Sequence, residues 1–98
     1  MIDPKETEII GNWIAKDGRV IGDEACERVR RLAEAYLLKI GSDWSGWDTL
    51  FKDPSDGRLW ERIYLQGHMH GGGPPSLCYI SKEEARAKYQ NLFDKNQR

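Results

Sequence analysis

Two Asp-Gly pairs, each standing between short runs of apolar residues, constrain this chain more than any other feature. The first pair is Asp17-Gly18, and the second closes the turn-rich segment 53–57. The first pair suits the two-residue turn of a β-hairpin, because both central turn positions take a positive φ that these residues tolerate. The second pair ends a turn-rich loop between two runs of aromatic and aliphatic residues, which is also typical of a hairpin. The sequence therefore predicts one hairpin whose first strand covers residues 9–15, and a second hairpin over residues 47–65.

Two segments have the pattern of amphipathic helices. After Asp23, which can cap a helix N-terminus, apolar residues recur at helical spacing. Ser81 and Glu84 have the form of a capping box, so a second helix is expected after residue 81. Residues 35–40 fit either a continued helix or a strand, and the strand is favoured because the Gly41-Ser42-Asp43 segment ends it. The expected core-facing residues of the two helices are Cys26, Val29, Leu32 and Ala33, and Ala85, Tyr89, Leu92 and Phe93.

Together these elements predict an α+β fold in one domain over residues 1–98. Hairpins dominate, and strands do not alternate regularly with helices, so we expect an antiparallel sheet of about five strands with both helices packed on one side. The chain is 39% hydrophobic and 32% charged, a composition typical of a folded domain with a single core. In the second hairpin, the side of Leu59 and Ile63 is the better candidate for the core than the side of Trp60.

The charge balance argues against nucleic acid or a membrane as the partner. Fifteen basic residues against sixteen acidic ones give a net charge of −1, so no net field would gather nucleic acid or an anionic lipid surface. Residues 1–8 are polar and acidic where a signal peptide is basic and then apolar, and no apolar run is long enough to span a bilayer. We therefore expect a cytoplasmic protein in which Cys26 and Cys78 are reduced, largely buried thiols.

The candidates for catalysis and metal binding are weak. His68 and His70 would project to the same side of an extended segment, which is one way to hold a metal, but few further ligands lie near them. The glycines 71–73 lead into Pro74-Pro75 and not into a helix, which argues against a phosphate cradle. A protein without catalytic activity, cofactor or metal is favoured, and a small metal-dependent enzyme using the two histidines is the alternative.

Aromatic and acidic residues around the second hairpin favour a binding function. Four Trp and four Tyr exceed what the core of so short a chain requires, and Trp, Tyr and Arg dominate the binding energy of protein interfaces. Nearby carboxylates could meet Lys or Arg in a partner's groove. For Trp13, Trp47 and Trp60, a place in the core is equally compatible with the pattern. The candidate binding residues are Asp43, Trp44, Asp48, Asp53, Asp56, Arg58, Trp60, Glu61, His68 and His70.

Three segments are distinctive in combination: Gly22-Asp23-Glu24, the run DPSDGRLWE at 53–61 and the run HGGGPP at 70–75. Through them, nearly the whole chain resembles the immunity protein 27 family of bacterial polymorphic-toxin systems. The resemblance implies an antidote encoded beside a secreted or contact-delivered toxin, often one with a nuclease domain, which it binds inside the producing cell. The expected partner is thus a cognate toxin domain, and an interaction module unrelated to toxins is a further alternative.

Overall fold

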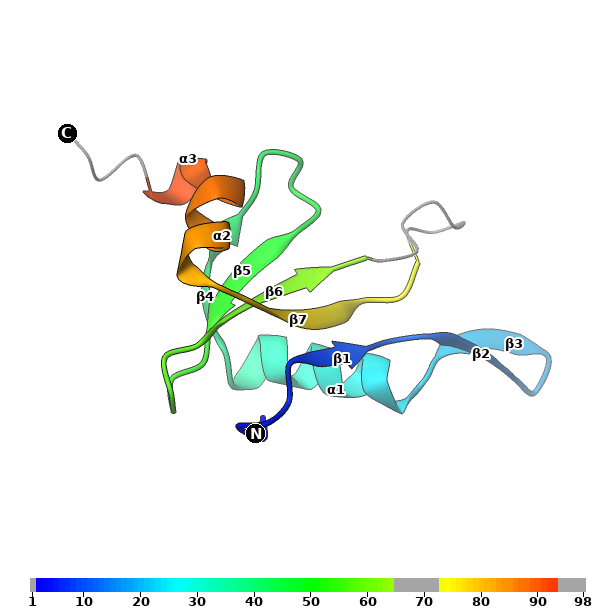
Figure 1. Cartoon of the computed structure of the whole chain (residues 1–98). Helices are drawn as coiled ribbons and strands as arrows, with labels where there is room; N and C mark the ends of the chain where they lie inside the picture. Colours follow the sequence, from blue (N-terminus) through cyan, green and yellow to red (C-terminus); the bar gives the residue numbers. More distant parts are fainter. Residues whose placement is uncertain (1, 65–72, 94–98) are drawn as a thin grey trace.

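The computed structural model describes residues 2–64 and 73–93, which form a five-stranded antiparallel sheet, a separate two-stranded hairpin and three helices (Figure 1). The sheet has the strand order β1-β7-β6-β5-β4. The predicted α+β class and the five-stranded antiparallel sheet are confirmed. The elements are β1 (Glu8–Ile10), β2 (Trp13–Lys16), β3 (Arg19–Gly22), α1 (Glu24–Ala35), β4 (Leu38–Ser42), β5 (Thr49–Lys52), β6 (Leu59–Ile63), β7 (Ser76–Ile80), α2 (Lys82–Lys88) and α3 (Gln90–Phe93).

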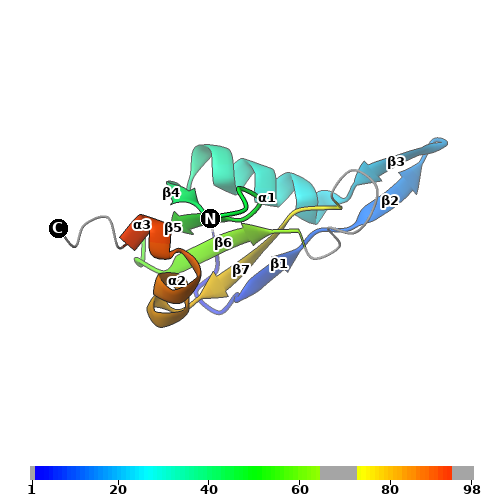
Figure 2. The same ribbon diagram turned by 90° about the horizontal axis from the view of Figure 1, so that it is seen from above.

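Helix α1 lies on one face of the sheet and α2 lies on the other (Figure 1, Figure 2). The sequence predicts both helices on the same face. Strand β5 shows the division. Phe51 belongs to the apolar cluster of Val29 on α1, and its neighbour Leu50 belongs to the cluster of Ala85 and Tyr89 around α2. Consecutive residues of a strand point to opposite faces, so a strand that is apolar on both sides needs a cover on each.

Trp60 shows the same point on β6. The sequence favours the side of Leu59 as the core side of this strand, but Trp60 on the other side is fully buried, in the cluster of Phe51 and Leu77. Leu59 is also partly buried, against the cluster around α2. Each side of β6 therefore contacts an apolar cluster, and the most deeply buried residue of the strand is Trp60, not a residue on the favoured side of Leu59.

Both predicted helix starts are confirmed. The Asp23 carboxylate accepts the N–H of Cys26 at 3.0 Å, and Cys26, Val29 and Leu32 are buried along α1. Ser81 Oγ accepts the N–H of Glu84 at 3.1 Å, while the Glu84 carboxylate accepts the N–H of Ser81 at 3.2 Å. These bonds satisfy N–H groups that the first turn of a helix leaves without partners.

The strand predicted over residues 9–15 is divided into two. β1 pairs with β7 at the edge of the sheet, while β2 pairs only with β3. A Cβ atom on Gly11, between the two strands, would collide with the carbonyl oxygen of Pro75 and lie 2.7 Å from Cys26 Sγ. Only glycine fits here, because it lets the backbone at residue 11 lie directly against the backbone of Pro75, just before β7.

Strands β2 and β3 form a hairpin that projects from the body of the molecule, here called the arm (residues 13–22; Figure 1, Figure 2). Its predicted turn is confirmed, since Asp17 and Gly18 have φ values of 53° and 77°. At the base of the arm, the Asn12 carbonyl accepts the N–H of Asp23 at 2.9 Å. The arm therefore leaves the body at the point where α1 begins.

The two cysteines agree with the prediction of reduced thiols. Both are free; Cys26 is buried and Cys78 is partly buried. Burial raises the pKa of both thiols, which keeps them protonated. Separately, no helix within the described ranges is long and apolar enough to cross a membrane.

Candidate binding surface

The structure divides the predicted binding residues between the two ends of β5. The loop 43–48 leads into this strand from β4, and the turn 53–58 leads out of it to β6. Trp60 and Glu61 lie between these ends, on β6. The eight predicted binding residues that lie within the described ranges therefore do not form one patch.

Asp53, one of the candidate binding residues in the turn-rich segment 53–57, is fully buried. One carboxylate oxygen accepts the Tyr36 hydroxyl at 2.6 Å and the Ser55 N–H at 2.8 Å, and this bond to Asp53 raises the pKa of Tyr36. The other oxygen is buried with no partner among the residues described. Asp53 thus closes the turn and holds the end of α1, so the prediction that it faces a partner is wrong.

Arg58 is bound within the chain. Its guanidinium donates to the Asp56 carboxylate at 2.8 Å and to the Glu6 carbonyl at 2.8 Å, and it lies 4.9 Å from the centre of the Trp60 ring. The backbone N–H and the side chain of Arg58 both lower the pKa of Asp56. Arg58 therefore fastens the N-terminal segment to the turn. Trp60 has no exposed surface, so the prediction that it contacts a partner is wrong.

The loop 43–48 presents two indoles to solvent. Trp44 is 80% exposed and Trp47 is 60% exposed. Trp47 makes an edge-to-face contact with Tyr64, with ring centres 5.8 Å apart, while no ring contact involves Trp44 within the described part of the chain. Single exposed apolar residues are common, but two neighbouring exposed tryptophans are not explained by the packing of the fold.

Hydrogen bonds within the loop fix its shape. The Asp43 carboxylate accepts the Ser45 hydroxyl at 2.8 Å and the Gly46 N–H at 3.1 Å. The Asp43 N–H donates to the Asp48 carbonyl at 3.0 Å, which closes the loop. Gly46 has a φ of 80°, a conformation that glycine adopts without strain. These polar contacts hold the loop without using either indole, so Trp44 stays exposed and Trp47 lies against the ring of Tyr64.

Behind the loop, Lys88 of α2 holds two carboxylates. Its ammonium lies 2.8 Å from Asp48 and 2.7 Å from Glu61, and the Tyr89 hydroxyl donates to Glu61 at 3.0 Å. Burial by itself would lower the pKa of Lys88, but its hydrogen bonds to Asp48 and Glu61 outweigh burial and raise it. Burial, together with the charge of Glu61, raises the pKa of Tyr89. Lys88, which the sequence analysis missed, joins the loop to α2 and β6.

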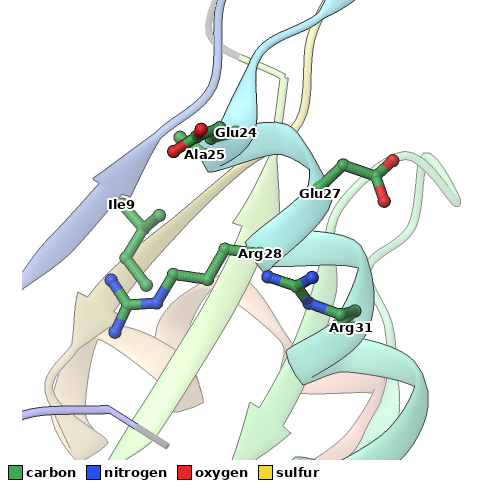
Figure 3. A pocket seen from close by; sticks show the side chains of 6 residues that line it. All are labelled: Ile9, Glu24, Ala25, Glu27, Arg28 and Arg31. Atoms are coloured by element: carbon green, nitrogen blue, oxygen red, sulfur yellow. The ribbon is translucent and has the colours of Figure 1, made fainter.

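A groove of about 590 Å³ lies between β1 and the first turns of α1 (Figure 3). Figure 3 shows Arg28 reaching from the helix past Ile9, while Glu27 points away from that strand. Arg28 donates two hydrogen bonds of 2.6 and 2.7 Å to Glu6, and these bonds lower the pKa of Glu6 to about 2. The lining contains neither histidine nor cysteine, so it assembles no nucleophile or base of those types. It consists of Ile9, Glu24, Ala25, Glu27, Arg28 and Arg31.

The two histidines of the metal hypothesis, His68 and His70, lie outside the described residues. Within residues 2–64 and 73–93, no three His, Cys, Asp or Glu side chains come together as a metal site would require. The hypothesis of a metal-dependent enzyme therefore depends on a segment for which the structure gives no geometry.

The loop 43–48 is suited to binding, because hydrogen bonds hold its shape while it exposes two indoles. The family model of immunity protein 27 matches residues 15–81, about two thirds of the chain, including the loop 43–48 and the turn 53–58. The chain belongs to the immunity protein 27 family, and this membership indicates a toxin-neutralising function. No curated protein and no solved structure matches the chain.

Proposed function

We propose that this chain is an immunity protein that binds a cognate bacterial toxin through the loop 43–48 and occludes it, inside the cell that makes both proteins. The observation that carries this proposal is the pair of exposed indoles, Trp44 and Trp47, on a loop that other residues hold in shape. Tryptophan is the residue type most often found at the energetic centre of protein interfaces. The family supplies the expected partner, a toxin domain.

The bracing of the loop favours tight binding. The bonds of Asp43 within the loop and of Lys88 behind it restrict the loop before any partner arrives. A surface that is already ordered loses less conformational entropy on binding, so more of the contact energy becomes affinity. We therefore expect a dissociation constant in the nanomolar range or below, as in other tight inhibitory complexes.

The acidic residues have a smaller part in this proposal than the sequence alone indicates. Asp43 is occupied by hydrogen bonds of its own loop, and Asp48 shares the ammonium of Lys88 with Glu61. Their charges are still available to steer a cationic groove, such as that of a nuclease, towards the loop. Among the residues that the structure describes, neither indole takes part in a hydrogen bond or ion pair, although Trp47 contacts the Tyr64 ring. We therefore expect the two indoles to supply most of the binding energy.

The test uses the toxin domain that this proposal expects to be encoded beside the chain's gene. Titration calorimetry should give nanomolar binding, and equimolar protein should abolish the toxin's activity. Trp44→Ala and Trp47→Ala should each weaken binding at least tenfold, equivalent to about 1.4 kcal/mol. Tyr79→Ala, at a half-exposed aromatic on β7, is the matched control and should leave affinity within about twofold.

Two results would contradict the proposal in different ways. Absence of both binding and protection with the wild-type chain would reject a toxin-neutralising function against this toxin. Unchanged affinity in the Trp44→Ala/Trp47→Ala double variant would move the interface away from the loop. Circular dichroism of each variant must match the wild type, and we expect it to match for Trp44→Ala because that indole is 80% exposed.

A further inference from the structure

The arm carries apolar side chains on both of its faces. Ile14 and Ile21 lie directly opposite each other and are both exposed, and Val20, 70% exposed, lies opposite Ala15 on the other face. Opposite residues of an antiparallel pair share a face, and the next pair along lies on the other face. A two-stranded ribbon has no further sheet to cover either side, so these side chains stay in water in the isolated chain.

The end of the arm carries a small positive charge, because Lys16 and Arg19 outnumber the single carboxylate of Asp17. Lys16 and Arg19 are the last pair before the turn and lie directly opposite each other. Like charges in this position repel across the strands. Neither side chain, nor that of Asp17 in the turn, makes an ion pair with another residue of the described ranges. The repulsion contributes nothing to the fold, which points to an anionic group outside this chain.

The base of the arm is fixed while its end is free. A Cβ atom on Gly22 would lie 2.8 Å from Cys26 Cβ, so the last residue of β3 packs closely on the start of α1. The Asn12 carbonyl accepts both the Asp23 N–H and, at 3.5 Å, the Cys26 thiol. Figure 2 shows the opposite end of the hairpin far from the sheet. Such an element presents its turn in a defined direction, which suits insertion into another molecule.

We propose that the arm enters an acidic cleft with apolar walls on the cognate toxin. Lys16 and Arg19 meet carboxylates at the bottom of this cleft, while Ile14, Val20 and Ile21 contact walls on its two sides. Apolar residues on both faces fit a cleft better than a flat surface, because a flat partner covers only one face of a ribbon. The inference rests on the proposed function and adds the chemistry of the partner's surface.

A second copy of this chain is a poorer occupant. The groove beside β1 is lined by two glutamates and two arginines, so it offers no net negative charge to a cationic arm. Arg28 in that groove is already bound to Glu6. We therefore assign the arm to a different protein, and association of this chain with itself becomes an outcome that the experiment must detect.

Charge reversal at the end of the arm gives the test, again with the toxin domain of the neighbouring gene as probe. Lys16→Glu/Arg19→Glu should weaken binding at least tenfold and reduce the dependence of affinity on salt concentration. Lys52→Glu/Lys82→Glu changes the net charge by the same amount at two exposed lysines outside the arm, and it should alter affinity less than threefold. Val20→Ser should weaken binding severalfold, with thermal stability unchanged because Val20 is exposed.

The outcomes separate this inference from the proposed function. If the wild type binds and Trp44→Ala weakens binding while the arm variants do not, the role of the arm is rejected and the proposed function stands. Equal losses in both charge-reversal variants would indicate an effect of net charge and would also reject it. A wild-type dimer in light scattering that Lys16→Glu/Arg19→Glu dissociates would show that the arm joins two copies. Failure of the wild type to bind would reject both proposals.

Discussion

Replacing Glu6 with glutamine tests how the segment before β1 is held against α1. The Glu6 carboxylate accepts two hydrogen bonds from Arg28, and the two side chains are 29% and 35% exposed. Glutamine keeps the shape of the side chain and can still accept the N–H of Asp3, but it carries no charge. We expect Glu6→Gln to lower the stability of the folded chain at neutral pH, because Arg28 loses its charged partner.

The pKa of Glu6 sets the size of the stability loss expected for Glu6→Gln. The hydrogen bonds from Arg28, and to a smaller extent the bond from the Asp3 N–H that glutamine would keep, lower this pKa from 4.5 to about 2, so the whole shift sets an upper bound. At about 1.36 kcal/mol for each tenfold change in acidity, this corresponds to about 3.4 kcal/mol. Since solvent reaches roughly a third of each side chain and screens the pair, we expect a loss of about 1–2 kcal/mol. In a domain of this size, each kcal/mol lowers Tm by about 4–8 °C.

Urea denaturation of both proteins between pH 7 and pH 2 is the assay. The pKa of Glu6 is lower in the folded chain, so its contribution is complete above pH 4.5 and is lost as the pH falls through about 2. The difference between the two proteins should therefore shrink on acidification. Glu27→Gln is the control, because its 2.6 Å pair with Arg30 is exposed and should matter little. A difference independent of pH, or an equal loss in the control, would refute the reasoning.

Three further substitutions test other contacts by urea or thermal denaturation. Gly11→Ala should lower stability by about 1–3 kcal/mol, because the added methyl group meets a backbone carbonyl and a buried sulfur. Asp53→Ala should cost about 2–3 kcal/mol, because a tyrosine hydroxyl and a backbone N–H lose their acceptor; an unchanged midpoint would show that water replaces the carboxylate. Lys88→Met should cost about 2 kcal/mol, less than a fully buried pair, because this side chain is 36% exposed; wild-type stability would show that the two carboxylates need no cation.

Local signals in the sequence predict the elements well, because turns and caps depend on residues close together in the chain. The turn at Asp17-Gly18 and the capping box at Ser81 both form as predicted. The placement of the helices depends on contacts between distant segments, and there the prediction fails. Leu50 and Phe51 are both apolar, and nothing local states which helix covers which of them.

The candidate site was predictable to a similar extent. The exposure of Trp44 agrees with its place in a polar, glycine-containing loop. Asp53 is buried beside Tyr36, which stands at the end of α1 and donates its hydroxyl to the Asp53 carboxylate. No local pattern in the sequence indicates that these two residues are in contact. Lys88 was missed for the same reason, since its partner Asp48 belongs to a loop distant in the chain.

Helix α1 covers one face of the sheet and α2 the other, so Leu50 and Phe51 of β5 and Trp60 of β6 all lie in the interior. The loop 43–48 and the arm, through which we propose that this chain binds its partner, both extend beyond this covered sheet (Figure 1). Substitutions there can retune recognition without disturbing Trp60 or Tyr89, which are both fully enclosed. In such a fold, the binding residues can be substituted as a toxin's surface changes, while the residues of the core stay the same.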